Sequence, residues 1–204
     1  ADPVQRATTL RQYRNYANLA ESYSAIPSNF LAITHGVSAV GKSHVAMRLV
    51  EALGAIRLRS DVERKRLFGD SKDLYAAEVS TATYKHLNEL AAVVLHAGFP
   101  VVIDATYLKH EQRLATAHVA EATGAPFLIL DCAAPKAVIE GWLAQRQAQN
   151  QDPSDATMEV IEAQLANREP LTADETLRSR HVETNLSGDL DKLVTDIRQY
   201  LPGL

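Results

Sequence analysis

The sequence is poor in cysteine and has no long apolar run, and both absences narrow the kinds of protein it can encode. The single cysteine, Cys132, excludes an intrachain disulfide and favours a reducing compartment. It lies within an apolar run, so we expect a buried, unreactive thiol. No apolar stretch reaches transmembrane length, and no signal-peptide pattern is present. We therefore expect a cytoplasmic protein without a membrane partner.

A strong excess of charge of one sign is also lacking. Among 204 residues, 21 Lys and Arg against 25 Asp and Glu give a formal net charge of -4. No global positive field favours nucleic acid, so a polynucleotide substrate would need a local basic patch. The seven histidines show no metal-binding spacing. With 46% hydrophobic and 23% charged residues, the composition is that of an ordinary globular protein with one domain and a small appendage.

One pattern in the sequence points directly to chemistry. Residues 36–43 read G-x-x-x-x-G-K-S, which is typical of a phosphate-binding loop. Its glycines let the backbone turn tightly and bring amide groups close to a polyphosphate. Lys42 would place its charge against the β- and γ-phosphates, and the Ser43 hydroxyl can ligate Mg²⁺. The residues expected to contact the nucleotide are Gly36, Val37, Ser38, Ala39, Val40, Gly41, Lys42, Ser43 and His44.

Apolar runs and amphipathic segments alternate along the chain, which predicts strands interleaved with helices. The predicted strands are 30–34, 55–61, 101–104, 126–132 and 181–185. The predicted helices are 5–23, one from the phosphate loop to 53, 62–68, 76–97, 110–123, one from about 135, 160–166 and 190–201. This order indicates a parallel, doubly wound α/β sheet with right-handed crossovers. Residues 1–29 would be an N-terminal helix and connector, and residues 30–204 the nucleotide-binding domain.

Two acids follow predicted strands, and ligands in such sheets bind at the carboxyl ends of the strands. We therefore expect Gly36, Asp61 and Asp104 to lie at one site. Asp104 would help to hold Mg²⁺, the alternative being a cap on a turn. The next residues are Ala105 and Thr106, not a water-activating acid, which favours transfer to an acceptor over hydrolysis. Asp61 would accept the proton of the acceptor hydroxyl, the alternative being a helix cap.

Basic residues near these acids are candidates for binding the acceptor. Arg64 lies one helical turn after Asp61 and could clamp an anionic or polar substrate. Arg113, on the helix after Asp104, could face the substrate, with a surface position as an equal alternative. The cations predicted to lie on the solvated surface are Arg59, Lys65 and Arg66.

The polar stretch at residues 146–156 is the predicted lid. Phosphoryl transfer requires cations on the developing charge and the exclusion of water, and a mobile segment could provide both. Arg146 stands at the start of this stretch, so it is a candidate for contacting ATP and for catalysis. An exposed arginine at a helix end is an equal alternative.

Several segments together resemble a known group of enzymes. They are the loop at 36–43, L-R-S-D-V-E-R-K-R-L at 58–67, V-I-D-A-T at 102–106, D-P-S-D-A at 152–156 and E-P-L at 169–171. The sequence resembles bacterial P-loop (AAA-type) kinases of the gluconate kinase, polynucleotide kinase and zeta-toxin-like group. It is most similar to the C-terminal kinase domain of bifunctional proteins with an aminoglycoside-phosphotransferase-like domain. The N-terminal helix resembles the connector in such fusions, and the start at Ala1 rather than Met suggests a fragment.

The resemblance implies a P-loop NTPase fold with sheet order 2-3-1-4-5 and use of ATP and Mg²⁺. It implies Asp61 as the base and Arg64 as a substrate contact, with Arg146 as the lid arginine and Asp155 ordering the lid. The loop departs from the usual pattern at Ala39, Val40 and His44. None of these changes removes a backbone N–H, so we expect nucleotide binding to be retained.

These observations predict a kinase that transfers the γ-phosphate of ATP to a hydroxyl of a sugar, a polyol or an antibiotic-like small molecule. One alternative is a kinase for nucleic-acid ends or nucleotide sugars, against which the acidic net charge weighs. Another is a nucleotide-sensing module that regulates a fused partner, against which the intact Lys42, Ser43, Asp61 and Asp104 weigh, since a pure sensor could lose some of them. A GTPase is disfavoured because no Asn-Lys-x-Asp motif occurs.

Overall fold

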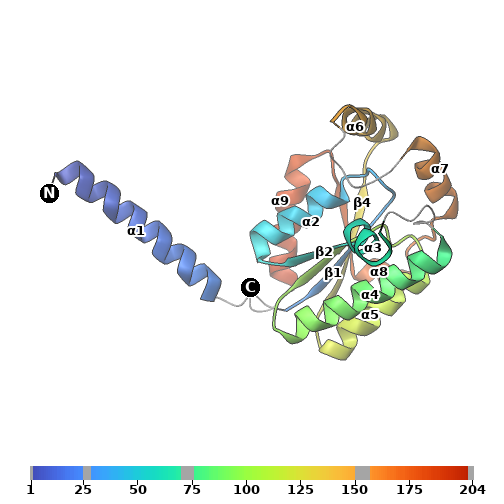
Figure 1. Ribbon diagram of the computed structural model, residues 1–204, viewed down its shortest axis with the longest axis horizontal. Helices are drawn as coiled ribbons and strands as arrows, with labels where there is room; N and C mark the ends of the chain where they lie inside the picture. The colour runs from blue at the N-terminus through green and yellow to red at the C-terminus, as the bar shows by residue number, and fades with distance from the viewer. Residues whose placement is uncertain (1, 25–28, 70–75, 150–156, 202–204) are drawn as a thin grey trace.

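A single parallel sheet organises the chain, as the computed structural model shows for residues 2–24, 29–69, 76–149 and 157–201 (Figure 1). The strand order is β2-β3-β1-β4-β5, and every neighbouring pair is parallel. The strands are β1 (Leu31–His35), β2 (Ile56–Arg59), β3 (Val101–Asp104), β4 (Phe127–Ala133) and β5 (Ser179–Glu183). The predicted α/β fold and the sheet order 2-3-1-4-5 are therefore confirmed.

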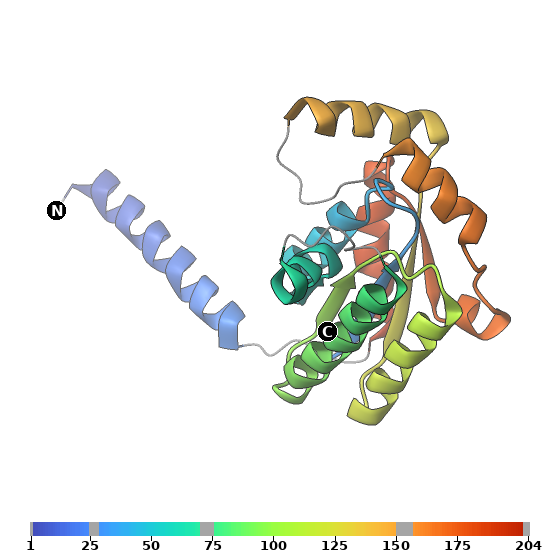
Figure 2. The ribbon, with the colours of Figure 1, turned by 45° about the vertical axis from the view of Figure 1, so that its right-hand side comes forward.

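Helices cover both faces of the sheet, which explains why the central strands are apolar on both sides. The helices are α1 (Pro3–Ser24), α2 (Lys42–Leu53), α3 (Ser60–Phe68), α4 (Ala77–His96), α5 (His110–Thr123), α6 (Lys136–Gln149), α7 (Met158–Asn167), α8 (Ala173–Leu177) and α9 (Ser187–Tyr200). Helices α2 and α9 lie on one face, and α4 and α5 lie on the other (Figures 1 and 2). In β1, Ala32 belongs to the first core and Leu31 and Ile33 to the second. Burying a side chain the size of leucine or isoleucine contributes about 1.5–3 kcal/mol.

Helix α1 lies apart from the sheet in Figure 1, and its described side chains are exposed. Its apolar side chains therefore face solvent in this structure, with Leu10 47% and Tyr13 69% exposed. Among the described residues, no helix combines the length and apolarity needed to cross a membrane.

The structure differs from the sequence prediction mainly after residue 135. Helix α6 continues to Gln149, so the first residues of the predicted lid are helical, and residues 150–156 lie outside the described part of the chain. The short helix α8 was not predicted, although its capping box, Thr172 with Glu175, has a sequence signature. Strand β5 begins at Ser179, two residues earlier than predicted. It is an edge strand with polar first residues, so an apolar pattern does not reveal where it begins.

Strand β2 ends at Arg59, so Asp61 lies in the first turn of α3 and not in a strand. Arg59 is the N-cap residue of α3, and no side chain caps this helix end. The alternative interpretation of Asp61 as a helix cap is therefore wrong. Asp104, as predicted, is the last residue of β3.

Candidate active site

The loop between β1 and α2 has the backbone shape that its glycines predict. Gly41 has φ of 90°, and a Cβ there would lie 2.8 Å from the side chain of Thr184. At Gly36, with φ of 138°, a Cβ would lie 2.7 Å from the carbonyl oxygen of Cys132. Val37 and Val40 turn their side chains into the core, so they contribute backbone groups only. Because α2 begins directly after Gly41, its positive N-terminal end faces this loop, an arrangement that binds anions.

Lys42 lies at the first position of α2 and is 8% exposed. Its Nζ donates a hydrogen bond of 2.6 Å to the carbonyl oxygen of Val37, within the same loop. The ammonium group is thus already held where a polyphosphate bound to the loop amides would lie.

The predicted metal-binding pair is brought together by the fold. The Ser43 hydroxyl donates to Oδ2 of Asp104 at 2.8 Å. A hydroxyl and a carboxylate fit Mg²⁺, which in nucleotide sites takes one or two protein oxygens and completes its shell with phosphates and water. No group of three or more His, Cys, Asp or Glu side chains that could hold a metal ion occurs in the described ranges.

A cation that the sequence analysis did not consider also holds Asp104. Arg57, on β2, donates from Nε to Oδ2 of Asp104 at 3.0 Å and pairs with the same oxygen through Nη2. Its side chain is 15% exposed, so the ion pair is largely shielded from water. Three donor groups thus converge on one carboxylate oxygen. In the sequence, Arg57 is one of the alternating polar residues of an edge strand, so its contact with Asp104 could not be predicted.

Asp61 is paired with a neighbouring arginine. Arg59 Nη2 donates to Asp61 Oδ2 at 2.8 Å, and the two side chains are 26% and 21% exposed. The prediction that Arg59 belongs to the solvated surface is therefore wrong, because it lines the same cavity as Asp61.

One cavity of about 480 Å³ joins the loop to both acids, and we call it the catalytic cavity. Its charged lining residues are Lys42, Arg59, Asp61, Arg64, Asp104 and Lys109. Its polar lining residues include Ser38, Ser43, Ser60, Ser80, Tyr84, Thr106, Gln112, Gln164 and Asn167. Asp61 and Asp104 thus lie with the phosphate loop at one site, as predicted, and Arg64 lines the same cavity.

A second cavity of about 510 Å³ also borders Gly41, and we call it the Trp142 cavity. It is lined by Gly41, His44, Trp142, Gln145, Thr184, Asn185, Ser187 and Leu190. The sequence analysis predicted Gly41 and His44 as nucleotide contacts but not the other residues, because they come from α6, from the segment after β5 and from α9. Trp142 is the only tryptophan in the sequence, so this cavity carries a built-in fluorescent probe.

Arg113 does not contact the catalytic cavity, so its assignment as a substrate contact does not fit the structure. The side chain is 0% exposed. Its guanidinium donates to both carboxylate oxygens of Glu175 at 2.7 and 3.0 Å and to the carbonyl oxygens of Tyr107, Glu169 and Pro170. Burial alone would raise the pKa of Glu175, but the Arg113 hydrogen bonds and the Thr172 N–H lower it to about 2. Arg113 therefore ties the segment after α7 to α5.

Replacing Arg113 with methionine should lower the free energy of unfolding by about 3–5 kcal/mol, because it removes the buried cation that pairs with Glu175 and donates to the carbonyl oxygens of Glu169 and Pro170. Urea unfolding at pH 7 measures the loss. Arg48→Met is the control, since Arg48 pairs with the exposed Asp191 and should cost less than about 1 kcal/mol. Equal losses in the two variants would refute the structural role of Arg113.

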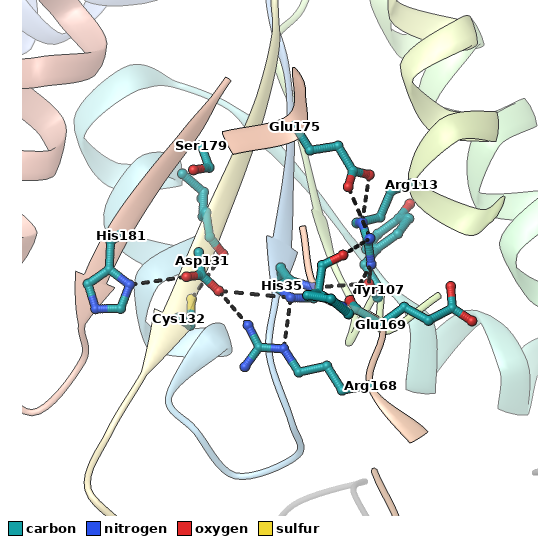
Figure 3. A network of polar contacts seen from close by, with 12 residues as sticks. His35, Tyr107, Arg113, Asp131, Cys132, Arg168, Glu169, Glu175, Ser179 and His181 are labelled. Atoms are coloured by element: carbon teal, nitrogen blue, oxygen red, sulfur yellow. Dashed lines mark hydrogen bonds and ion pairs between the residues drawn. The ribbon is translucent and has the colours of Figure 1, made fainter. Parts of the chain in front are cut away.

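A second polar network lies under the loop, at the ends of β1 and β4 (Figure 3). His35, 0% exposed, donates from Nδ1 to the carbonyl oxygen of Tyr107 at 3.0 Å and accepts at Nε2 from Arg168 at 3.1 Å. Arg168 also donates to Asp131 at 2.9 Å, and Asp131 pairs with His181. Burial and the Arg168 charge lower the pKa of His35 to about 4. The ring is thus neutral at pH 7 and has a structural role.

This pKa predicts that the protein loses stability in mild acid. The unfolded chain takes up a proton at His35 near pH 6.5, but the folded protein does so only near pH 4, so stability falls as the pH drops through this window. The loss should be about 3 kcal/mol. Urea unfolding at several pH values should show this slope in the wild type and a smaller one in His35→Asn. His118→Asn, at an exposed position, should keep the wild-type slope, and an unchanged slope in His35→Asn would contradict this assignment.

Arg146 lies within helix α6, but its side chain is outside the described part of the structure, as is Asp155 with residues 150–156. Their predicted roles in a lid stay predictions.

Comparisons with known proteins agree with this architecture. A family model described as an AAA domain matches residues 31–171. No curated protein matches the chain in sequence. Similar solved structures include a sugar kinase from Janibacter sp. HTCC2649, with 20% identity, 86% of this chain and 95% of that chain covered, and a TM-score of 0.63. Two others each cover 86% of this chain and 98% of their own. One is the APS kinase CysC of Mycobacterium tuberculosis in complex with AMPPNP and APS, with 20% identity and a TM-score of 0.59. The other is a gluconokinase from Sinorhizobium meliloti 1021, with 19% identity and a TM-score of 0.58.

At these identities the structural matches establish the fold, and none of them supports the predicted link to an aminoglycoside-phosphotransferase-like partner. The family model spans most of the sheet, from β1 to the residues after α7, and so includes the phosphate loop and both acids. The chain belongs to the AAA domain family and has the kinase-like fold of a P-loop protein.

Proposed function

We propose that the protein is an ATP-dependent kinase that transfers the γ-phosphate to a hydroxyl group of a small, anionic acceptor. The observation that carries this proposal is the catalytic cavity, which Lys42 lines together with Asp61 and Asp104. A candidate phosphate-binding cation, a candidate metal-binding acid and a candidate base thus share one space.

Gly41 of the loop borders both cavities, and this arrangement supports one orientation for bound ATP. The nucleoside would occupy the cavity beside Trp142 and His44, the phosphates would cross the N-terminus of α2, and the γ-phosphate would enter the catalytic cavity. Ser43 and Asp104 would hold Mg²⁺, which supplies charge neutralisation on the phosphates when it is bound.

Asp61 would accept the proton of the acceptor hydroxyl as that oxygen attacks the γ-phosphorus. A new oxygen–phosphorus bond forms, the bond from phosphorus to the β-γ bridging oxygen breaks, and ADP leaves with its added charge next to Lys42. Arg59, 2.8 Å from Asp61, would hold this carboxylate toward the cavity. Catalysis would come from positioning and electrostatics, without a covalent intermediate.

The charges of the catalytic cavity favour an anionic acceptor. Besides Lys42 and Asp104, the charged lining residues are the cations Arg59, Arg64 and Lys109 and the acid Asp61, with Arg59 paired to Asp61 and Lys109 paired to Glu169 outside the cavity. Ser80 and Gln112, which also line the cavity, carry hydroxyl and amide groups that would suit a polyol. The names of two structural neighbours, an APS kinase and a gluconokinase, refer to acceptors that are anions. A polycationic antibiotic would be repelled, so a sugar acid or sugar phosphate fits better.

Acceptor-dependent release of ADP, measured with matched pairs of compounds, tests this proposal. Each pair consists of an anionic polyol and its neutral parent, such as a sugar acid and the sugar, and aminoglycosides and nucleosides complete the panel. We expect turnover with at least one anionic compound and at least about tenfold lower kcat/KM with its neutral parent, as for one lost charged contact. ATP binding without turnover on any acceptor would favour the nucleotide-sensing alternative.

An upstream partner domain, which the N-terminal helix predicts, also stays a proposal. The exposed apolar side chains of α1, among them Leu10, Tyr13 and Tyr16, would suit contact with such a domain.

A further inference from the structure

One peptide unit of the phosphate loop is held from both sides by side chains. The carbonyl oxygen of Val37 accepts from Lys42 at 2.6 Å, and the next N–H, that of Ser38, donates to Oε1 of Gln164 at 2.7 Å. Nε2 of Gln164 donates in turn to the Ser38 hydroxyl at 3.0 Å. The amide of Gln164 therefore makes two matched hydrogen bonds to one residue of the loop, 126 positions earlier in the chain.

Gln164 reaches the loop from α7, a helix that is anchored at its end and follows the predicted lid. Directly after α7, Arg168 is bonded to His35 and Asp131 under the loop (Figure 3). At its start, the side chain of Thr157 caps the helix by accepting from Val160. Helix α7, which begins soon after residue 156, is therefore bonded to the phosphate loop through Gln164.

Gln164 lies on the side of the loop where the γ-phosphate would be. It lines the catalytic cavity together with Lys42 and Asp104 and does not line the Trp142 cavity. When ATP binds, the Lys42 ammonium would turn from the Val37 oxygen toward the γ-phosphate, which ADP lacks. Among the described side chains, Gln164 then remains as the group that bonds this peptide unit.

We propose that Gln164 is a positioning residue for phosphoryl transfer. It keeps the Val37–Ser38 peptide oriented when Lys42 turns toward the γ-phosphate of ATP. Through this contact, the position of α7 would depend on whether the γ-phosphate is present. This inference rests on the proposed kinase function, and ADP, which lacks the γ-phosphate, provides the means to separate the two.

The test compares ADP with a non-hydrolysable ATP analogue by the fluorescence of Trp142, in the wild type and in Gln164→Ala and Gln164→Glu. For Gln164→Ala we expect affinity for ADP within about threefold of wild type, with about tenfold loss both of affinity for the ATP analogue and of kcat. Gln164→Glu keeps an acceptor for the Ser38 N–H but adds a negative charge near the γ-phosphate. It should therefore lose at least as much affinity for the ATP analogue, again without a change for ADP.

Glu162→Ala is the matched control on the same helix, because Glu162 is 62% exposed and pairs only loosely with Lys136, at 3.5 Å. It should leave both affinities and kcat unchanged. Equal losses of affinity for ADP and the ATP analogue in the Gln164 variants would mean that the contact merely supports the loop. Wild-type affinities and kcat in these variants would mean that the contact has no role. Either result overturns the inference. A wild-type protein that binds neither nucleotide would instead overturn the proposed function, and this inference with it.

Discussion

Replacing Lys42 with methionine is expected to reduce acceptor-dependent ADP release at least about a thousandfold, because the variant loses the buried cation that faces the developing charge on the phosphates. Lys42 is 8% exposed and already sits inside the loop, so no other described cation can take its place without moving the loop. Methionine has a similar length and preserves the packing of α2. A coupled ADP assay gives the rate, and circular dichroism checks that the fold is retained.

Lys85→Met provides the control for this substitution. Lys85 lies on α4, is 79% exposed and reaches Glu89 only at 4.0 Å, so its loss should leave the rate unchanged. A Lys42 variant that folds and retains more than about a tenth of the wild-type rate would contradict a role for this cation in the transfer step.

Replacing Asp61 with asparagine is expected to lower kcat by about a hundredfold to ten-thousandfold, since an amide of the same shape cannot accept the proton of the acceptor. Asparagine can still accept the hydrogen bond from Arg59, so the local structure should survive. Nucleotide affinity, followed by Trp142 fluorescence, should change little because Asp61 lies toward the acceptor. The effect should therefore appear in kcat and not in the binding of ATP.

Asp191→Asn matches this substitution away from the site. Asp191 also accepts from an arginine, Arg48 at 2.6 Å, but it is 74% exposed on α9. It should have wild-type kinetics. Full activity in the Asp61 variant would show that another group receives the proton, and the assignment of the base would then be wrong.

The sequence was sufficient to predict the fold because its strongest signals are local. The phosphate loop, the fully apolar strand that ends at Asp104 and the spacing of helices and strands each depend on neighbouring residues only. Together with the rule that ligands bind at the carboxyl ends of parallel strands, they also predicted that Ser43 and Asp104 would meet.

The contacts that could not be predicted are those between residues far apart in the sequence. Nothing near Arg57 indicates that it reaches Asp104, and nothing near Gln164 indicates that it reaches Ser38. Arg113 was misplaced because helix periodicity identifies an inward face but does not say whether that face meets a cavity or a buried acid such as Glu175. A buried arginine with a full set of acceptors has the same sequence pattern as a substrate clamp.

The most direct test of the account is phosphorus NMR of the wild-type protein with ATP, Mg²⁺ and the anionic acceptors of the panel. We predict that the γ-phosphate signal is replaced by a phosphate monoester signal on the acceptor, in an amount equal to the ADP formed. Inorganic phosphate as the sole new product, with or without acceptor, would contradict transfer to a hydroxyl group and indicate hydrolysis instead.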